Sequence, residues 1–274
     1  MLSVKVYYNS FILVISNMYF NIDCPNRMKN SNNQNFTCKG INCAYALLDS
    51  DRFNIVNIYM LKGGRADKEK RLKSFIRDQV VSYLNKDQFF RKFSEGRSQG
   101  VVVEFHGRLF DNILPDFKDS SDVCLLALDQ IEDPQNFGQI IRTADCAGID
   151  GIIVPQHNSA PITQTVLQVS QGAFVNMPIY QLTNLSQGIK ELKKNDFWTI
   201  GVENSIDSKL WHEVDYSGKT VIVVGSEGKG IRQKTIKNCD FKATIPMKGK
   251  INSLNVSAAV SAILFERQRQ LNKD

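Results

Sequence analysis

Short apolar runs alternate with helix-like segments throughout the second half of this 274-residue chain. Residues 123–129 are apolar up to a final Asp129, which is typical of a strand that is buried on both faces of its sheet. Further extended segments are expected at 152–155, 175–180, 198–202, 220–224 and 242–246, and helices at 137–147, 163–170, 185–194 and 254–270. This alternation predicts an α/β fold, in which a mostly parallel sheet is covered by helices.

The first half of the chain predicts a smaller α/β domain. Its helices are expected at 42–48 and 67–80, and its strands at 55–60 and 99–105. Because residues 106–121 contain Pro115 and follow no strong period, they are expected to be a linker. The expected order is an extension, a small domain, a linker and a larger domain, at 1–35, 36–105, 106–121 and 122–274.

The extension at 1–35 is expected to be disordered or mis-assigned, with a natural start at Met18 or Met28. Its apolar run, residues 11–15, is too short to cross a bilayer, and no clear cleavage site follows it. We therefore expect no membrane association.

The formal net charge of +6 is unevenly distributed. Residues 36–119 carry 15 Lys and Arg against 11 Asp and Glu, whereas residues 120–274 carry 16 of each kind. Between Lys62 and Lys92, ten basic residues accompany four acidic ones. Such a segment suits a phosphate backbone, although a solvated helix face with local ion pairs would have the same composition.

The six cysteines include no C-x-x-C pair, and Cys124 and Cys146 lie in apolar runs. All six are therefore expected to be free thiols, which indicates a reducing compartment such as the cytoplasm. The three histidines lie far apart in the sequence, so no metal site is predicted.

Three segments of the second half place polar residues where a strand is expected to end and a helix to begin. The segments are residues 133–143, 224–230 and 245–255, and their polar residues include Asn136, Arg142, Glu227, Ser253 and Asn255. Open α/β sheets bind their ligands at the carboxyl ends of the strands. We therefore expect these five side chains to surround one pocket.

A glycine-rich turn after a strand is also typical of nucleotide phosphate sites. The turn here contains Gly225, Gly228 and Gly230, a spacing that fits neither the P-loop nor G-x-G-x-x-G. Glu227 within the turn would repel a pyrophosphate, and it suits a cationic or hydroxyl-bearing ligand better.

Taken singly, the polar residues also have structural explanations. Asn136 and Ser253 suit helix N-caps, Gly148 suits a helix C-terminus, and Arg142 suits an ion pair with Asp145. Capping does not explain why three strand ends of one sheet all carry such residues.

Taken together and in this order, the three segments resemble the motifs of the SpoU (TrmH-like) branch of the SPOUT methyltransferases. The resemblance covers nearly all of residues 122–270, and through 153–155, 158–160 and the closing helix it points to the bacterial 23S rRNA guanosine ribose methyltransferases. It implies transfer of a methyl group from S-adenosyl-L-methionine to a ribose 2′-hydroxyl of RNA, without a metal.

The resemblance has further implications for the fold and its partners. It implies a deep trefoil knot in the larger domain, and a homodimer to whose interface the closing helix contributes. It also implies that the small domain resembles ribosomal protein L30e, with residues 39–45 as its opening helix. The family usually has a His before the strand at 99–105, where this chain has Ser98.

The resemblance also assigns roles to individual residues. The backbone groups that would hold the methyl donor in the knot belong to Gly225, Ile245, Met247 and Leu254. The side chains that would order the site and the incoming nucleotide are Asn136, Glu227, Ser253 and Asn255. Arg142 matches the proposed catalytic arginine of the family, assisted by an RNA phosphate. Since an arginine side chain stays protonated at neutral pH, holding a phosphate and stabilising alkoxide charge is its simpler role.

Other functions remain open from the sequence. The alternatives are a tRNA ribose 2′-O-methyltransferase, a non-catalytic RNA-binding protein of the same fold, and a binder of small nucleotides. The presence of all five polar site residues favours a methyltransferase.

Overall fold

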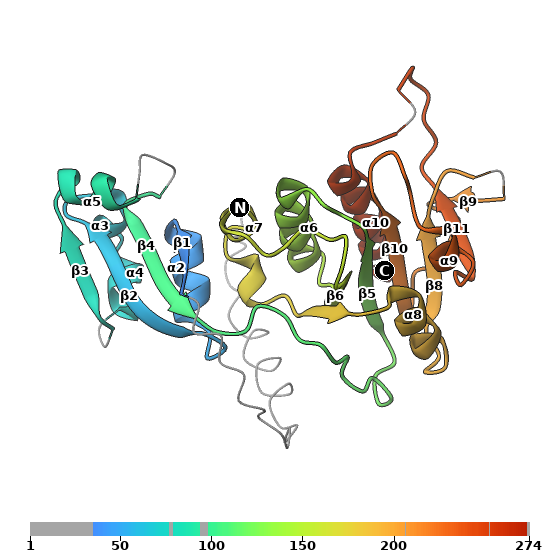
Figure 1. Cartoon of the computed structure of the whole chain (residues 1–274), viewed down its shortest axis with the longest axis horizontal. Coiled ribbons are helices and arrows are strands. Elements are labelled where there is room, and N and C mark those ends of the chain that lie inside the picture. The colour runs from blue at the N-terminus through green and yellow to red at the C-terminus, as the bar shows by residue number, and fades with distance from the viewer. Residues whose placement is uncertain (1–34, 77–78, 94–97, 206, 252, 273–274) are drawn as a thin grey trace, which may run out of the picture. The chain divides into compact units, whose positions relative to one another are not determined.

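The computed structural model describes residues 35–76, 79–93, 98–205, 207–251 and 253–272 (Figure 1). Apart from Asn35, the expected extension lies outside these ranges, as do both candidate start residues. Among the described residues, no helix is both long enough and apolar enough to cross a membrane.

The second half of the chain forms a seven-stranded sheet, here called the large sheet. Its strands are β5 (Val123–Asp129), β6 (Gly151–Pro155), β7 (Ile179–Leu182), β8 (Trp198–Val202), β9 (Lys209–Leu210), β10 (Lys219–Gly225) and β11 (Phe241–Thr244). They lie in the order β7-β6-β5-β10-β8-β11-β9, and every neighbouring pair is parallel. The predicted parallel sheet is confirmed.

Helices cover both faces of the large sheet, because its central strands are apolar on both sides. These helices are α6 (Pro134–Cys146), α7 (Gln164–Val169), α8 (Leu185–Lys193), α9 (Gln233–Ile236) and α10 (Val256–Leu271), with a 3₁₀ turn η1 (Ala173–Val175). Leu126 and Leu128 of β5 share a core with residues of α6 and α10, whereas Leu125 and Ala127 share one with α8 and α9.

The predicted helix after β5 begins earlier than expected. Its N-cap is Asp133, whose side chain accepts a hydrogen bond from the backbone N–H of Gln135. Asn136 lies inside the first turn and is buried, so the prediction that it caps the helix is wrong. Pro134 allows the earlier start, since its ring suits the first helical position. Gly148 does end the helix as predicted, with a positive φ of 63°.

The first half forms a mixed four-stranded sheet, here called the small sheet, in the order β1-β4-β2-β3. Its strands are β1 (Phe36–Lys39), β2 (Asn54–Leu61), β3 (Val81–Leu84) and β4 (Val101–His106), and its helices are α2 (Ile41–Leu48), α3 (Arg65–Lys68), α4 (Lys70–Phe75) and α5 (Lys86–Phe93). The prediction of a single helix at 67–80 is wrong. Glu69 is extended between α3 and α4, and β3 follows Val80.

The small sheet and the helices of the large sheet share one apolar core, and residues 34–274 form a single compact unit. The ring of Phe174 in η1 stacks on Phe105 with centroids 5.7 Å apart, and Phe53 meets Phe174 edge-on. Arg52 donates hydrogen bonds to the carbonyls of Val175 and Met177. The segment after α7 is therefore held from the first half of the chain.

Cys38 and Cys43 are joined by a disulfide, so the prediction that every cysteine is a free thiol is wrong for this pair. Their spacing matches no familiar motif, and it is the turn from β1 into α2 that brings their Cα atoms to 6.2 Å. The free thiols among the described residues are Cys124, Cys146 and Cys239, as expected, and Cys24 lies outside those residues.

Candidate functional site

Except for Arg142, the predicted site residues gather at the carboxyl ends of β5, β10, β8 and β11, which are neighbours in the large sheet. The chain leaves β5 toward β6 on one side, and it later returns to place β10 on the other side. This reversal of strand order is the place where open α/β sheets form their ligand crevice.

A tight loop follows β10 and carries Glu227. The backbone N–H of Gly230 donates to the carbonyl of Ser226 at 3.0 Å, which closes the loop. A Cβ at Gly225 would overlap the backbone carbonyl group of Gly230. Gly228 and Gly230 have positive φ angles of 81° and 64°, so the loop requires glycine at more than one point.

An ion pair between a half-exposed arginine and a buried carboxylate anchors the far end of this loop. Asp129, at the end of β5, is fully buried and accepts from the Nε of Arg232 at 2.7 Å and from its backbone N–H at 2.9 Å. The Nη2 of Arg232 lies 2.6 Å from the same carboxylate. Both guanidinium contacts are made to Oδ1 and the backbone N–H bonds to Oδ2, so the carboxylate holds the side chain and the backbone of Arg232 together.

Three polar side chains from three elements form one hydrogen-bonded group. The Nδ2 of Asn255 donates to the Oδ1 of Asn136 and to the Oε1 of Glu227, both at 2.9 Å. Asn136 also donates to Glu227 at 3.2 Å, and the N–H of Val256 points to the same oxygen. Asn255 also caps α10, because its Oδ1 accepts from the N–H of Ser257.

A cavity of about 400 Å³, here called the central cavity, opens between this group and the strand ends. All four residues that were predicted to hold the donor line this cavity, namely Gly225, Ile245, Met247 and Leu254. Glu227 and Ser253 line it as well. A smaller cavity of about 180 Å³ is lined by Asn136 and also by Glu227. Glu227 therefore lines both cavities.

The central cavity also contains a carboxylate that the sequence analysis missed. Glu203 follows β8, and its Oε2 atom is buried without a hydrogen-bond partner among the described residues. A buried carboxylate oxygen without a donor is costly, so its position favours a ligand that carries N–H or O–H groups. The oxygen of Ser226, which is also buried and unpartnered, lines the same cavity.

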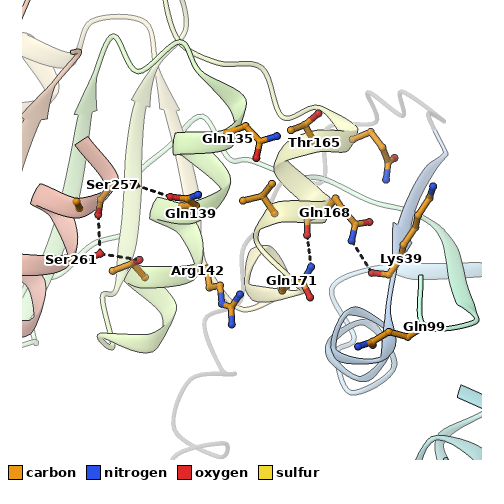
Figure 2. Close-up of a pocket in the computed structure, with 14 residues that line it drawn as sticks. Lys39, Gln99, Gln135, Gln139, Arg142, Thr165, Gln168, Gln171, Ser257 and Ser261 are labelled. Carbon is orange, nitrogen blue, oxygen red and sulfur yellow. Dashed lines mark hydrogen bonds between the residues drawn. The ribbon is translucent and has the colours of Figure 1, made fainter. Parts of the chain in front are cut away.

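Arg142 does not join the other predicted site residues. It lies nearly two turns further along α6 than Asn136, which is about 9 Å along the helix axis. It is exposed, and it lines a different and larger cavity with Gln139 and Lys39 (Figure 2). No described carboxylate forms an ion pair with it, so the considered pair with Asp145 is not observed.

The structure thus brings together Asn136, Glu227 and Asn255, with Ser253 on the cavity wall. Asp129, Arg232 and Glu203 were missed, although the acidic end of the apolar run at 123–129 was a usable signal for Asp129. Within the described ranges, no group of three or more His, Cys, Asp or Glu side chains could hold a metal ion.

Comparison with known proteins identifies the family of the chain. Residues 124–265 match the SpoU rRNA Methylase family. The chain is 35% identical over 239 residues to the 23S rRNA (guanosine-2′-O-)-methyltransferase RlmB of Escherichia coli, covering 84% of this chain and 97% of that protein. It is 40% identical over 183 residues to RlmB of Pseudomonas aeruginosa, covering 65% and 73%.

A solved structure is similar over almost the whole chain. The SpoU methyltransferase AviRb from Streptomyces viridochromogenes, in complex with the cofactor AdoMet, superposes with a TM-score of 0.74 at 20% identity. The match covers 91% of this chain and 96% of AviRb. At this identity the similarity shows the fold, including both sheets.

Proposed function

This chain belongs to the SpoU rRNA methylase family, and we propose that it transfers a methyl group from S-adenosylmethionine to the 2′-oxygen of a guanosine ribose in 23S-type rRNA. The observation that carries the proposal is the group Asn136–Glu227–Asn255 beside the central cavity. RlmB proteins, to which the chain is similar over most of its length, are named for this reaction.

The central cavity fits a donor of this chemistry. Its walls combine apolar side chains, such as Ile245 and Leu254, with the unpartnered carboxylate oxygen of Glu203. S-adenosylmethionine has an apolar adenine face, ribose hydroxyls and a cationic amino acid end, and it supplies an electrophilic methyl group when bound. We expect the backbone groups of Gly225, Ile245, Met247 and Leu254 to hold it, and Glu203 to accept one of its N–H or O–H groups.

The hydrogen-bonded group orders the place where the ribose would enter. Asn136 and Asn255 fix the carboxylate of Glu227, so its position is set before any substrate binds. Ser253 is exposed on the cavity wall and can contact the incoming nucleotide. Holding the 2′-oxygen in line with the methyl group, at about 3–3.5 Å, supplies much of the rate enhancement.

Arg142 is proposed to act on the RNA and not on the donor. Its guanidinium is exposed and lines a cavity separate from the donor residues. A protonated guanidinium can hold a phosphate next to the target nucleotide and stabilise charge as the 2′-hydroxyl loses its proton.

We also propose the features that the family resemblance implies for the whole chain. These are a trefoil knot within residues 122–274, an L30e-like RNA-binding domain at 36–105 joined by a linker at 106–121, and a homodimer that uses α10. An rRNA substrate would place the enzyme in the cytoplasm.

The test is to map ribose methylation in RNA from cells that lack this protein. One guanosine of the large-subunit rRNA should lose its 2′-O-methyl group, and the purified full-length protein with S-adenosylmethionine should restore it. If methylation were lost only in tRNA, the substrate of the enzyme would be tRNA and not rRNA. No change in either RNA, with no restoration, would contradict a methyltransferase.

A further inference from the structure

One cavity among the described residues is larger than the central cavity, and Arg142 is its only lining residue with a role so far. It measures about 1050 Å³ and lies between α6, α7, α10, the end of β1 and the turn before β4 (Figure 2). Six of its lining residues are glutamines: Gln99, Gln135, Gln139, Gln164, Gln168 and Gln171. We call it the glutamine-lined cavity.

Helices α6 and α7 each present two amides one turn apart to the cavity. On α6, Gln135 and Gln139 share a helix face with Arg142. On α7 the two are Gln164 and Gln168, and Gln171 follows the end of that helix at a positive φ of 54°. The two helices pack closely, since a Cβ at Gly138 would come within 2.7 Å of the Val169 side chain.

Some of these amides hold the fold together. Gln164 bonds to Thr37, and the Nε2 of Gln168 donates to the carbonyl of Lys39, so both join α7 to β1. Other amide atoms remain available. Gln135 has no side-chain hydrogen bond among the described residues, and the Oε1 of Gln168 is buried without a partner.

The charged side chains that line the cavity are all positive. Lys39 and Arg142 are its only charged lining residues, and no carboxylate among the described residues lines it. The Nζ of Lys39 donates to a backbone carbonyl at 2.8 Å, which leaves its charge without a described acidic partner. The cavity therefore offers two positive charges and many amide donors and acceptors.

We propose that the glutamine-lined cavity binds an unpaired nucleotide of the substrate RNA, close to the one that is methylated. This inference rests on the proposed function, and it adds a site for recognition of the RNA sequence. Glutamine amides can pair with the donors and acceptors on a base edge, and single-stranded RNA exposes those edges. Arg142 and Lys39 hold the adjoining phosphate.

Charge changes at Gln135 test the cavity directly. Gln135 lies in the first turn of α6, where a Glu stabilises the helix and so does not weaken folding. Gln135→Glu should weaken RNA binding by the full-length protein about tenfold, and Gln135→Lys should preserve or strengthen it. The matched control is Gln233, an exposed first-turn residue of α9 that lines none of the cavities described above. Gln233→Glu should change RNA affinity less than about twofold.

A second experiment identifies the bound base. Single abasic nucleotides are placed in turn on both sides of the methylated position in an RNA fragment, and affinity is measured for the natural protein and Gln168→Met. One abasic position should weaken binding by the natural protein and have no further effect on Gln168→Met, because the base and the amide act as a pair. Thermal denaturation shows whether the variant is folded.

Some outcomes would overturn the inference while leaving the methyltransferase intact. Equal effects of Gln135→Glu and Gln233→Glu would show that only long-range charge matters. A change in dimer dissociation without a change in RNA affinity would make the cavity a subunit contact. In either case the natural protein would still methylate RNA, which separates this failure from failure of the proposed function.

Discussion

Asn255 shows how closely the site residues depend on one another. Its amide nitrogen bonds to Asn136 on α6 and to Glu227 in the glycine loop, while its oxygen caps α10. One side chain thus joins three segments that are far apart in the sequence. Substitution of any member therefore moves the others, and single substitutions will not be additive.

Glu203 should affect donor binding. We expect Glu203→Gln to weaken S-adenosylmethionine binding about tenfold or more, because a hydrogen bond to a charged group contributes about 1.5–3 kcal/mol. Isothermal titration calorimetry measures the effect. Glu191→Gln, an exposed change on α8, is the control. Unchanged affinity in Glu203→Gln would place the donor away from this carboxylate.

Arg142 should affect the reaction but not donor binding. Arg142→Ala is expected to slow methyl transfer by about 10²–10⁴, and Arg142→Lys to restore little, since a point charge does not replace the planar guanidinium. Single-turnover measurements with saturating RNA distinguish chemistry from binding. If Arg142→Ala transferred the methyl group at the wild-type rate, Arg142 would have no part in the mechanism.

At the scale of elements, the loop after β10 is determined by backbone contacts. Gly225 leaves no space for a side chain, because the loop folds back until Gly230 lies against it. The pair Asp129–Arg232 holds the far end of the loop. The position of Glu227 therefore depends on residues that lie outside the hydrogen-bonded group.

Replacement of Gly225 tests this dependence. Gly225→Ala should destabilise the protein by about 1–3 kcal/mol, as overpacking of a close contact does, and should weaken donor binding strongly. Gly249→Ala is the matched control, since a Cβ there meets nothing closer than 4.0 Å. Thermal denaturation and calorimetry give both quantities. A Gly225→Ala protein with normal stability would mean that the loop relaxes freely.

At the scale of the molecule, the basic residues of the first half include a group on α3, α4 and the turn before them. Lys62, Arg65, Lys68 and Lys70 are exposed, and none has an ion pair among the described residues. The central cavity is lined only by residues from 202 onward. The first half of the chain therefore offers a basic surface for RNA, while the central cavity belongs to the second half.

This division predicts the salt dependence of RNA binding. Combined replacement of Lys62, Arg65 and Lys68 by Ala should reduce the slope of log affinity against log salt by about 0.7–0.9 for each phosphate that the variant no longer neutralises. Donor affinity should not change. The control replaces Lys190, Lys194 and Lys237, which are exposed on or next to α8 and α9. If both variants had the same slope of log affinity against log salt, the basic surface would be exposed to solvent and would not contact RNA phosphates.

The proposed dimer can be tested on α10. Phe265 is 51% exposed on this helix, although it is a large apolar residue. Phe265→Glu should convert a dimer into a monomer, which sedimentation velocity detects, because an interface does not tolerate an unpaired buried charge. Lys237→Glu, an exposed change next to α9 at a residue without an ion pair among the described residues, is the control. A wild-type monomer would contradict the dimer itself.

Much of the large sheet could be predicted because its strands are continuous apolar runs and its helices have clear ends. Residues 123–129 and Gly148 are examples. Prediction failed where polar local patterns were overridden by packing. The basic segment at 67–80 has a helical pattern, yet it divides at Glu69 and is followed by a strand that pairs with β2.

The sequence by itself determined the class of fold, the strand ends that carry the site and the residue types needed there, because these depend on local periodicity and on short motifs. Only the tertiary structure decided which side chains meet. It joined Asn136 to Asn255 and separated both from Arg142. It also placed Glu203 in the central cavity and six glutamines around another. Such contacts join distant segments, and their geometry is set by packing of the whole core.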